Sequence, residues 1–174
     1  LVEVYDLLDL SASPRVTNPA DGDPSDVYWG FRVAMSSDNL FVSSLFGGKI
    51  TVYDLSDMSI VNTITCPDAY DFRFANEIIC NSTHLFVGQS TGREDPNDNM
   101  TEAGKVWVYN LSDFSVEHIL YPINGEFGDH FGSTIKVSDT HLVVGAYGDD
   151  EANGHNQNIG AVYLYELSDL SGDR

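Results

Sequence analysis

Apolar and polar residues alternate in short segments that recur along the chain, and each segment contains a tyrosine followed by a turn. The segments are residues 4–7, 52–55, 108–111 and 164–167, and their tyrosines are 48, 56 and 56 residues apart. In the last three copies a glycine stands four residues before the segment. Alternation over a few residues, bounded by glycine and a turn, predicts a β-strand at each place.

A second repeated pattern begins with an aromatic residue and a small residue. The pairs are Trp29-Gly30, Phe74-Ala75 and Phe131-Gly132, and a leucine opens an apolar run ten residues after each small residue. Turn-forming residues at 37–39, 81–83 and 138–140 separate the two parts. This pattern predicts two further strands per repeat, and a fourth is predicted after the serine–aspartate turn, at 60–65 and 116–120.

The chain is therefore predicted to be a tandem series of four-stranded units. No stretch shows a sustained apolar period of about 3.6 residues, so helix is not expected. Four antiparallel strands every roughly 40–55 residues are typical of the blades of a β-propeller, whose faces stack on neighbouring blades. Strand two is almost wholly apolar and is expected to be covered on both faces, whereas the alternating strand three is expected to be peripheral.

We expect an all-β fold of about three blades plus an extra strand, forming a single β-propeller region over residues 1–174. The repeats run approximately over 1–48, 49–104 and 105–160, and residues 161–174 start a further repeat. Propellers usually have four to eight blades. We therefore expect the chain to be part of a longer polypeptide. The alternatives are a ring or filament completed by neighbouring copies, and a closed three-bladed ring.

The third repeat resembles the FG-GAP repeat family. The resemblance is carried by residues 131–132, 144–146, 148–150 and 160–163. The other repeats depart from it, with Ala75 after the aromatic residue in the second and Ser43-Ser44 in place of Gly-Ala in the first. The family builds integrin-α-like propellers and many secreted microbial and protist proteins. The resemblance therefore implies a propeller at an extracellular or cell-surface location, with protein or glycan as partner.

Composition and charge narrow the range of partners. Hydrophobic residues make up 42% of the 174 residues, which is enough for a real core. The chain has 8 lysines and arginines against 27 aspartates and glutamates, and its formal charge of −19 repels nucleic acid and anionic membrane surfaces. No apolar run approaches the ~18 residues of a membrane helix. We therefore expect no nucleic acid partner and no membrane insertion.

Two acidic loops between the second and third strands suggest bound calcium. Each places oxygen-bearing side chains at loop positions 1, 3 and 5, the spacing by which a tight loop wraps Ca²⁺. The candidate ligands are Asp149, Glu151 and Asn153 in the third repeat and Asp95, Asn97 and Asn99 in the second. Family members often bind calcium through a turn between strands one and two, which here is only residues 138–140. The alternative is that Asp, Asn and Gly simply favour solvated turns.

Three N-glycosylation sequons fall in predicted turns or loops, where an acceptor is exposed. Their asparagines are Asn81, Asn99 and Asn110. We expect at least one to be modified if the source is eukaryotic; the alternative is coincidence in a sequence rich in Asn, Ser and Thr. The two cysteines, Cys66 and Cys80, end different strands about 20 Å apart and are expected to be unpaired, with Cys80 buried.

The residue pattern does not favour an enzyme. His130 follows Asp129 near the expected ring centre, but no serine or cysteine in a nucleophile setting accompanies it. We favour a non-catalytic extracellular module for protein or glycan interaction or adhesion. One alternative is a structural subunit of an extracellular filament or surface appendage, joined through its end strands. The other is the accessory propeller of a larger secreted enzyme.

Overall fold

A computed structural model describes residues 1–9, 11–17, 28–68, 73–91, 103–123, 125–150 and 159–170. These ranges contain β-strands and no helix, so none of them holds a helical segment that could cross a membrane. The strands are β1 (Val2–Val4), β2 (Arg15–Thr17), β3 (Trp29–Met35), β4 (Asn39–Ser44), β5 (Lys49–Asp54), β6 (Ile60–Thr65), β7 (Phe74–Cys80), β8 (His84–Gln89), β9 (Lys105–Asn110), β10 (Val116–Leu120), β11 (Phe131–Val137), β12 (His141–Ala146) and β13 (Ala161–Glu166).

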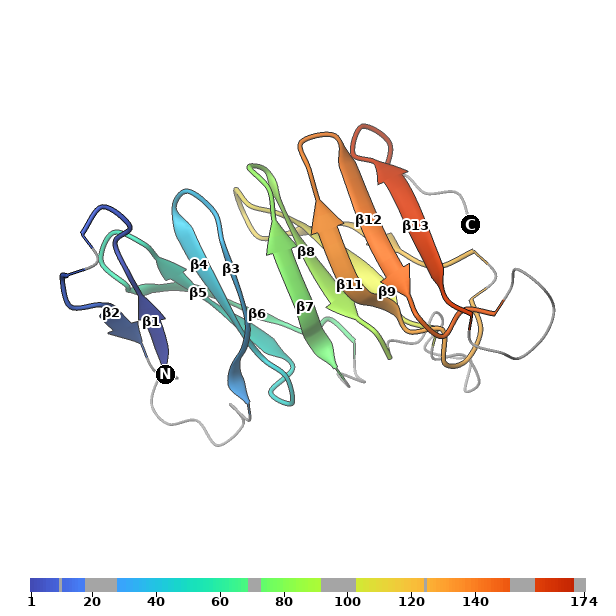
Figure 1. The fold of residues 1–174 in the computed structure, drawn as a ribbon, viewed down its shortest axis with the longest axis horizontal. Helices are drawn as coiled ribbons and strands as arrows, with labels where there is room; N and C mark the ends of the chain where they lie inside the picture. The colour runs from blue at the N-terminus through green and yellow to red at the C-terminus, as the bar shows by residue number, and fades with distance from the viewer. Residues whose placement is uncertain are drawn as a thin grey trace.

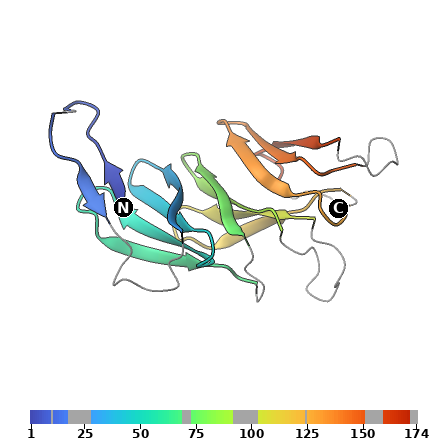
Figure 2. The same ribbon diagram turned by 60° about the horizontal axis from the view of Figure 1, so that its bottom comes forward.

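The strands form antiparallel sheets that follow one another in chain order. Strands β3–β6 and β7–β10 each form a four-stranded sheet, β11–β13 form a three-stranded sheet, and β1 pairs with β2. Figures 1 and 2 show the β1–β2 pair at one end of the molecule and the β11–β13 sheet at the other. Within each sheet neighbouring strands are consecutive, as in a propeller blade. The predicted all-β fold of partial propeller blades is confirmed.

The turn after each third strand is held by its own side chains. Asp54 Oδ1 accepts the N–H two residues further on at 2.7 Å, and Asp57 Oδ1 does the same at 2.8 Å. Asn110 and Asp113 repeat the arrangement in the next sheet, at 2.8 and 2.9 Å. Such Asx turns satisfy backbone donors locally, which explains why the serine–aspartate signature recurs at each of these turns.

Each first strand begins with its aromatic residue between two residues in the left-handed backbone region. Around Phe131 the φ angles are 58° at His130 and 82° at Gly132. The other two aromatic residues are flanked in the same way, and Ala75 takes the glycine position with φ 59°. The strand pairing shifts register directly after each aromatic residue, which marks a β-bulge. Glycine suits this position because the left-handed region costs other residues about 1–2 kcal/mol.

Apolar clusters fill the spaces between successive sheets. Between the β3–β6 and β7–β10 sheets lie Phe41, Ile50, Val52, Ile64, Phe74, Ala75, Ile78, Leu85, Val87, Trp107 and Tyr109. Between the β7–β10 and β11–β13 sheets lie Phe86, Val106, Val108, Leu120, Phe131, Ile135, Leu142, Val144, Ala146 and Leu170. A smaller cluster joins the β1–β2 pair to the β3–β6 sheet through Leu40, Val42 and Tyr53. We call the aromatic residue and the small residue after it at the beginning of β3, β7 and β11 an aromatic start. Phe74 and Phe131, in the second and third of these, are fully buried, as expected for residues between blades.

The start of one sheet also contacts the main chain of the sheet before it. The Phe131 N–H donates to the Ala103 carbonyl at 2.8 Å, and Phe131 forms a parallel bridge with Gly104. A Cβ atom at Gly88 would overlap the Gly132 carbonyl oxygen, and one at Gly104 would overlap Phe131. Backbone therefore packs directly on backbone between the two sheets, and only glycine leaves room for it.

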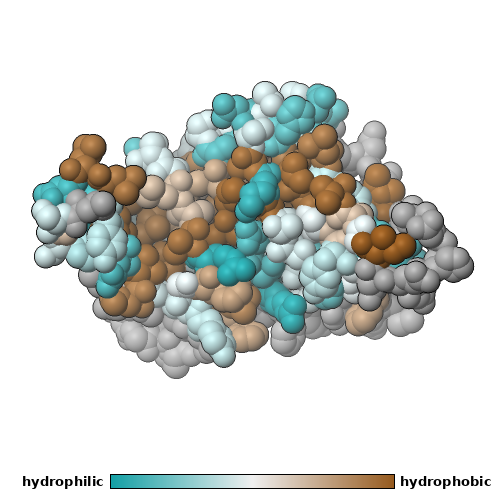
Figure 3. All heavy atoms as spheres, viewed as in Figure 1, coloured by the Kyte–Doolittle hydropathy of each residue, from teal (hydrophilic) through white to brown (hydrophobic). Residues whose placement is uncertain are grey.

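Charged side chains link the first strands across three sheets. Arg32 Nε on β3 donates to Glu77 Oε2 on β7 at 3.0 Å, and Lys136 Nζ on β11 lies 3.7 Å from Glu77 Oε1. In Figure 3 polar atoms run through the middle of this view between apolar atoms on both sides. Partly exposed pairs of this kind contribute about 0–1 kcal/mol each, so most of the attraction between sheets comes from the apolar clusters.

Two expectations are corrected by the packing. The third strand is not peripheral in the four-stranded sheets: β9 is buried over its first five residues and β5 over its middle four. The cause is that a neighbouring sheet covers each face, so the polar positions in the alternation face protein as well. Neither Cys66 nor Cys80 forms a disulfide, as expected, but Cys80 is half-buried rather than buried.

Candidate interaction surfaces

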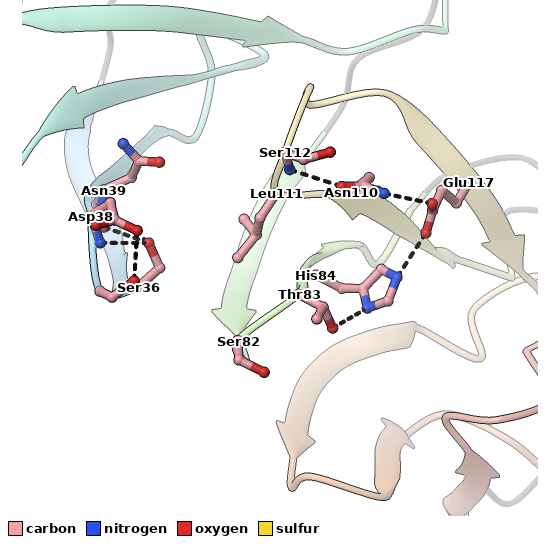
Figure 4. A pocket seen from close by; sticks show the side chains of 11 residues that line it. Ser36, Asp38, Asn39, Ser82, Thr83, His84, Asn110, Leu111, Ser112 and Glu117 are labelled. Atoms are coloured by element: carbon pink, nitrogen blue, oxygen red, sulfur yellow. Dashed lines mark hydrogen bonds and ion pairs between the residues drawn. The ribbon is translucent and has the colours of Figure 1, made fainter.

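A polar groove of about 520 Å³ lies where turns of the two four-stranded sheets meet. Figure 4 shows turn residues of the β3–β6 sheet on one side and turn residues of the β7–β10 sheet on the other. The lining residues are Ser36, Ser37, Asp38, Asn39, Ser82, Thr83, His84, Asn110, Leu111, Ser112 and Glu117. All of them except Leu111 carry polar side chains. The groove therefore offers hydrogen bonds rather than the apolar lining typical of small-molecule pockets.

One wall of the groove holds a connected hydrogen-bond network (Figure 4). Thr83 Oγ1 lies 2.8 Å from His84 Nδ1, and His84 Nε2 lies 2.7 Å from Glu117 Oε2. The Asn110 amide nitrogen donates to Glu117 Oε1 at 2.7 Å. Both hydrogen bonds lower the pKa of Glu117 below its usual value, and the one from Asn110 has the larger effect. At neutral pH the wall thus presents an ionised carboxylate with both oxygens already bonded.

The order hydroxyl, imidazole, carboxylate in this wall is similar to a nucleophile–base relay. However, Thr140 Oγ1 and His141 Nδ1 are also 2.8 Å apart at the equivalent turn of the next sheet. The Thr83 hydroxyl also lies 3.2 Å from Asn81 Oδ1 within its own turn. A contact that recurs with the turn is explained by turn geometry. We therefore assign the Thr83–His84 contact a structural role.

Two of the predicted sequon asparagines border the groove. Asn110 lines it, and Asn81 directly precedes the lining residue Ser82. Asn81 Oδ1 accepts the backbone N–H groups of Thr83 and His84 at 2.9 and 2.8 Å. The amide nitrogen of Asn110, to which a glycan would be attached, is the atom that donates to Glu117 in the groove wall, so a glycan on Asn110 would begin at the groove. The third sequon asparagine, Asn99, lies outside the described residues.

Of the predicted calcium ligands, the structure describes Asp149. Asp149 is 4% exposed as a residue; its carboxylate accepts a hydrogen bond from the Tyr163 hydroxyl at 2.5 Å, and its carbonyl accepts the Gly160 N–H at 2.8 Å. Asp149 therefore joins the two ends of the connection between β12 and β13. The other candidates lie outside the described residues: Glu151, Asn153, Asp95, Asn97 and Asn99.

A second buried carboxylate, Asp129, lies beside this loop. It is 3% exposed, and its Oδ2 accepts the Glu126 N–H at 2.7 Å. Its carbonyl accepts the Gly148 N–H at 3.0 Å, so the two segments are in direct contact. Burial raises the pKa of Asp129, and the nearby charges of Asp149, Asp150 and Glu126 raise it further.

Sequence reasoning missed this proximity because the aspartate does not recur. The equivalent positions, two residues before the other aromatic starts, hold Val27 and Phe72. Within the described ranges, no group of three or more His, Cys, Asp or Glu side chains is arranged to hold a metal ion. The described carboxylates therefore make the region around Asp129 and Asp149 negative, but they do not form a complete set of metal ligands.

His130 lies between two sheets rather than in an open site. Its ring stacks on Tyr147, with centroids 4.5 Å apart and planes at 16°. Its Nδ1 donates to the Ser90 carbonyl at 3.2 Å, since a carbonyl oxygen can only accept. Both contacts are of the kind that holds sheets together.

The β11–β13 sheet leaves one face open where the other sheets are covered. The residues of β5 and β9 that point toward the following sheet are fully buried: Ile50, Val52, Val106 and Val108. Their equivalents on β13 are Val162 and Leu164, which are 74% and 66% exposed. Val143 on β12, paired with Leu164, is half-buried on the same face. We call the surface formed by Val143, Val162 and Leu164 the open face.

A shallow cavity of about 390 Å³ adjoins the open face. Gly145 and Gly160 line it, and these are the repeat equivalents of Gly88 and Gly104. In the preceding sheet Gly88 and Gly104 receive the backbone of Phe131-Gly132. The cavity therefore corresponds to the place that an aromatic–glycine pair fills at the neighbouring interface, and we call it the open socket.

The family model of the FG-GAP repeat matches residues 114–165. The matched segment runs from the turn before β10 through almost all of β13, and so includes the aromatic start of β11 and both glycines of the open socket. No curated protein matches the sequence. The family match confirms the resemblance drawn from the third repeat and agrees with the blade-like sheets.

Proposed function

The chain carries an FG-GAP repeat, and on that premise we propose that it is a non-catalytic extracellular β-propeller module that associates with protein through its open face. The family's propellers occur in secreted proteins, and two sequons border one groove, which supports an extracellular setting. The network in that groove has a turn-stabilising explanation, which supports a binding role over catalysis.

The observation that carries this proposal is the exposure of Val162 and Leu164 at positions that both complete sheets bury. Transfer of a large apolar side chain from water to a packed interface contributes ~1.5–3 kcal/mol. Large apolar side chains gathered on one exposed sheet face mark an interaction surface. The open face is formed by two neighbouring strands, β12 and β13, and such a surface suits another sheet better than a small molecule.

The polar groove is a second contact surface in this proposal. Its hydroxyl, amide and carboxylate groups suit a hydrogen-bonding partner such as a glycan or a polar protein loop. A glycan attached to Asn110 would occupy the same groove, so attached and bound glycan exclude each other there. The open face, which has no sequon asparagine on β11–β13, would be unaffected.

Photo-cross-linking tests the proposal. A chain with p-benzoylphenylalanine in place of Leu164 is incubated with extracellular proteins from its source and irradiated, and adducts are mapped by mass spectrometry. A matched control carries the same probe at Val61 on β6, which is 48% exposed but lies off the open face. Adducts to β-strand segments of identified proteins from position 164, and not from 61, support the proposal. A folded chain whose position 164 forms no protein adduct overturns it.

A further inference from the structure

We infer that the open face and open socket receive the start of β3 from a second copy of this chain, so that copies join head to tail. This inference rests on the proposed function, because it names the partner of the open face. Of the three aromatic starts described, two pack on a four-stranded sheet and one packs on the two-stranded β1–β2 pair.

The Trp29-Gly30 start is the loosely packed one. Phe74 and Phe131 are fully buried against complete sheets, whereas Trp29 is half-buried and packs on the two-stranded β1–β2 pair. Among the described residues, the buried Trp29 indole nitrogen has no hydrogen-bond partner. A Cβ atom at Gly30 would meet Val2 Cγ2 at 3.5 Å, whereas one at Gly132 would lie 2.7 Å from the Lys105 carbonyl oxygen. Among the described residues, no backbone contact like the one that seats Phe131 is found around Gly30.

Strand β1 occupies the position that β13 of another copy would take. Residues 2–5 and 162–165 are the same element of the repeat, so Val2 and Val4 correspond to Val162 and Leu164. Val2 and Val4 are only half-buried against the β3–β6 sheet. The β1–β2 pair has three residues in each strand, and an isolated two-stranded ribbon of this size is marginally stable. The β11–β13 sheet of a second copy can therefore replace it and cover more apolar surface.

The two halves of this interface lie at opposite ends of the molecule (Figure 1). A contact between two different surfaces is heterologous. Copies joined in this way form a ring if the rotation from one copy to the next closes a circle, and an open filament if it does not. Each copy carries a formal charge of −19, so repulsion opposes the contact. Salt screens that repulsion over a Debye length of about 10 Å at 0.1 M. Association is therefore expected to strengthen with added NaCl, the opposite of a contact held by ion pairs.

Sedimentation velocity of the purified chain over a range of concentrations gives the first test. We expect concentration-dependent species larger than a monomer, and more of them at high NaCl. Val162→Asp is expected to raise the dissociation constant at least about tenfold, because a carboxylate would be buried without a partner. Val61→Asp, a matched valine on β6, is expected to leave it unchanged. A monomer at every concentration and salt level overturns the inference.

Mixing two variants separates head-to-tail contact from a symmetric contact of two open faces. Val162→Asp disables the receiving face, and Trp29→Ala disables the inserted start. Each variant alone is expected to be monomeric, and an equal mixture is expected to form one-to-one dimers. A symmetric contact would instead leave Trp29→Ala able to associate by itself, and that result overturns the inference.

Cross-linking provides a measurement that does not depend on Trp29→Ala folding. Purified chain with p-benzoylphenylalanine at position 164 is mixed with ¹⁵N-labelled chain and irradiated. Adducts to labelled peptides covering residues 28–35 support the inference. Adducts elsewhere in the labelled chain, or no adduct, overturn it. If position 164 captures another extracellular protein but not this chain, the second copy is excluded while the proposed function stands.

Discussion

Replacing Gly132 by alanine tests the backbone contact between the second complete sheet and the β11–β13 sheet. Gly132 has φ 82°, so an alanine there carries a conformational penalty of about 1–2 kcal/mol. Its Cβ atom would also lie 2.7 Å from the Lys105 carbonyl oxygen and 3.1 Å from Val106 Cγ2. Overpacking of this kind adds typically 1–3 kcal/mol. We therefore expect a loss of about 2–5 kcal/mol in the free energy of unfolding.

Gly30→Ala is the matched control, because Gly30 has nearly the same φ of 83°. Its Cβ atom would meet Val2 Cγ2 at 3.5 Å, an ordinary contact, so only the conformational penalty of about 1–2 kcal/mol applies. Both variants are compared by urea denaturation, at a protein concentration at which the chain is monomeric, followed by far-ultraviolet circular dichroism and tryptophan fluorescence. The difference between the two losses in the free energy of unfolding measures the cost of placing a Cβ atom in the contact between the sheets.

Equal losses for Gly132→Ala and Gly30→Ala would refute this reasoning, because they would show that the Lys105 carbonyl can move aside freely. Gly88→Ala separates the two contributions further. Gly88 lacks a positive φ, but its Cβ atom would overlap the Gly132 carbonyl oxygen. We expect it to destabilise the chain by overpacking alone.

Three further predictions concern charge, metal and modification. Because burial raises the pKa of Asp129, its ionised form destabilises the folded chain above the usual aspartate pKa of 3.8. Asp129→Asn should therefore stabilise the chain at pH 7 in EDTA, and urea denaturation should show the gain vanishing near pH 3; a loss at pH 7 would contradict this. Calcium should raise the melting temperature of the wild type but not of Asp149→Asn in differential scanning calorimetry, and the absence of any calcium effect would rule out the site. In chain secreted from eukaryotic cells, peptide mass spectrometry should find glycan on Asn81 or Asn110, and an intact mass equal to that of the polypeptide would refute it.

The strands and their order could be predicted because their signals are local. Each signal depends on a few neighbouring residues. Examples are the alternation before Tyr53, the aspartate turns after it and the aromatic–glycine start. Because these signals repeat along the chain, they also predicted that the sheets have the same strand order. Stacking of the sheets, as in a propeller, could be predicted because each sheet has two apolar faces to bury.

Burial and proximity between sheets could not be predicted in the same way. The polar positions of β9 face the preceding sheet, so Lys105 is buried although its strand alternates; its ammonium pairs with Asp68. The contact between Asp129 and the Asp149 loop depends on the segments that precede β11 and follow β12. Asp129 has no equivalent in the other repeats, so the repeated pattern does not predict this contact. The open face could be recognised only once Val162 was compared with its buried equivalent, Val106.

The backbone packing between Gly88, Gly104 and the Phe131-Gly132 start has a consequence for which substitutions this chain tolerates. Main-chain atoms make this junction, so exchanges of most side chains around it leave the contact itself unchanged. A Cβ atom at Gly88 or Gly104, by contrast, would overlap main-chain atoms of the next sheet, so any other residue at these two positions would force the sheets to shift. The first sheet has Ser43 at the position of Gly88, so this sensitivity belongs to the junction between the second and third sheets.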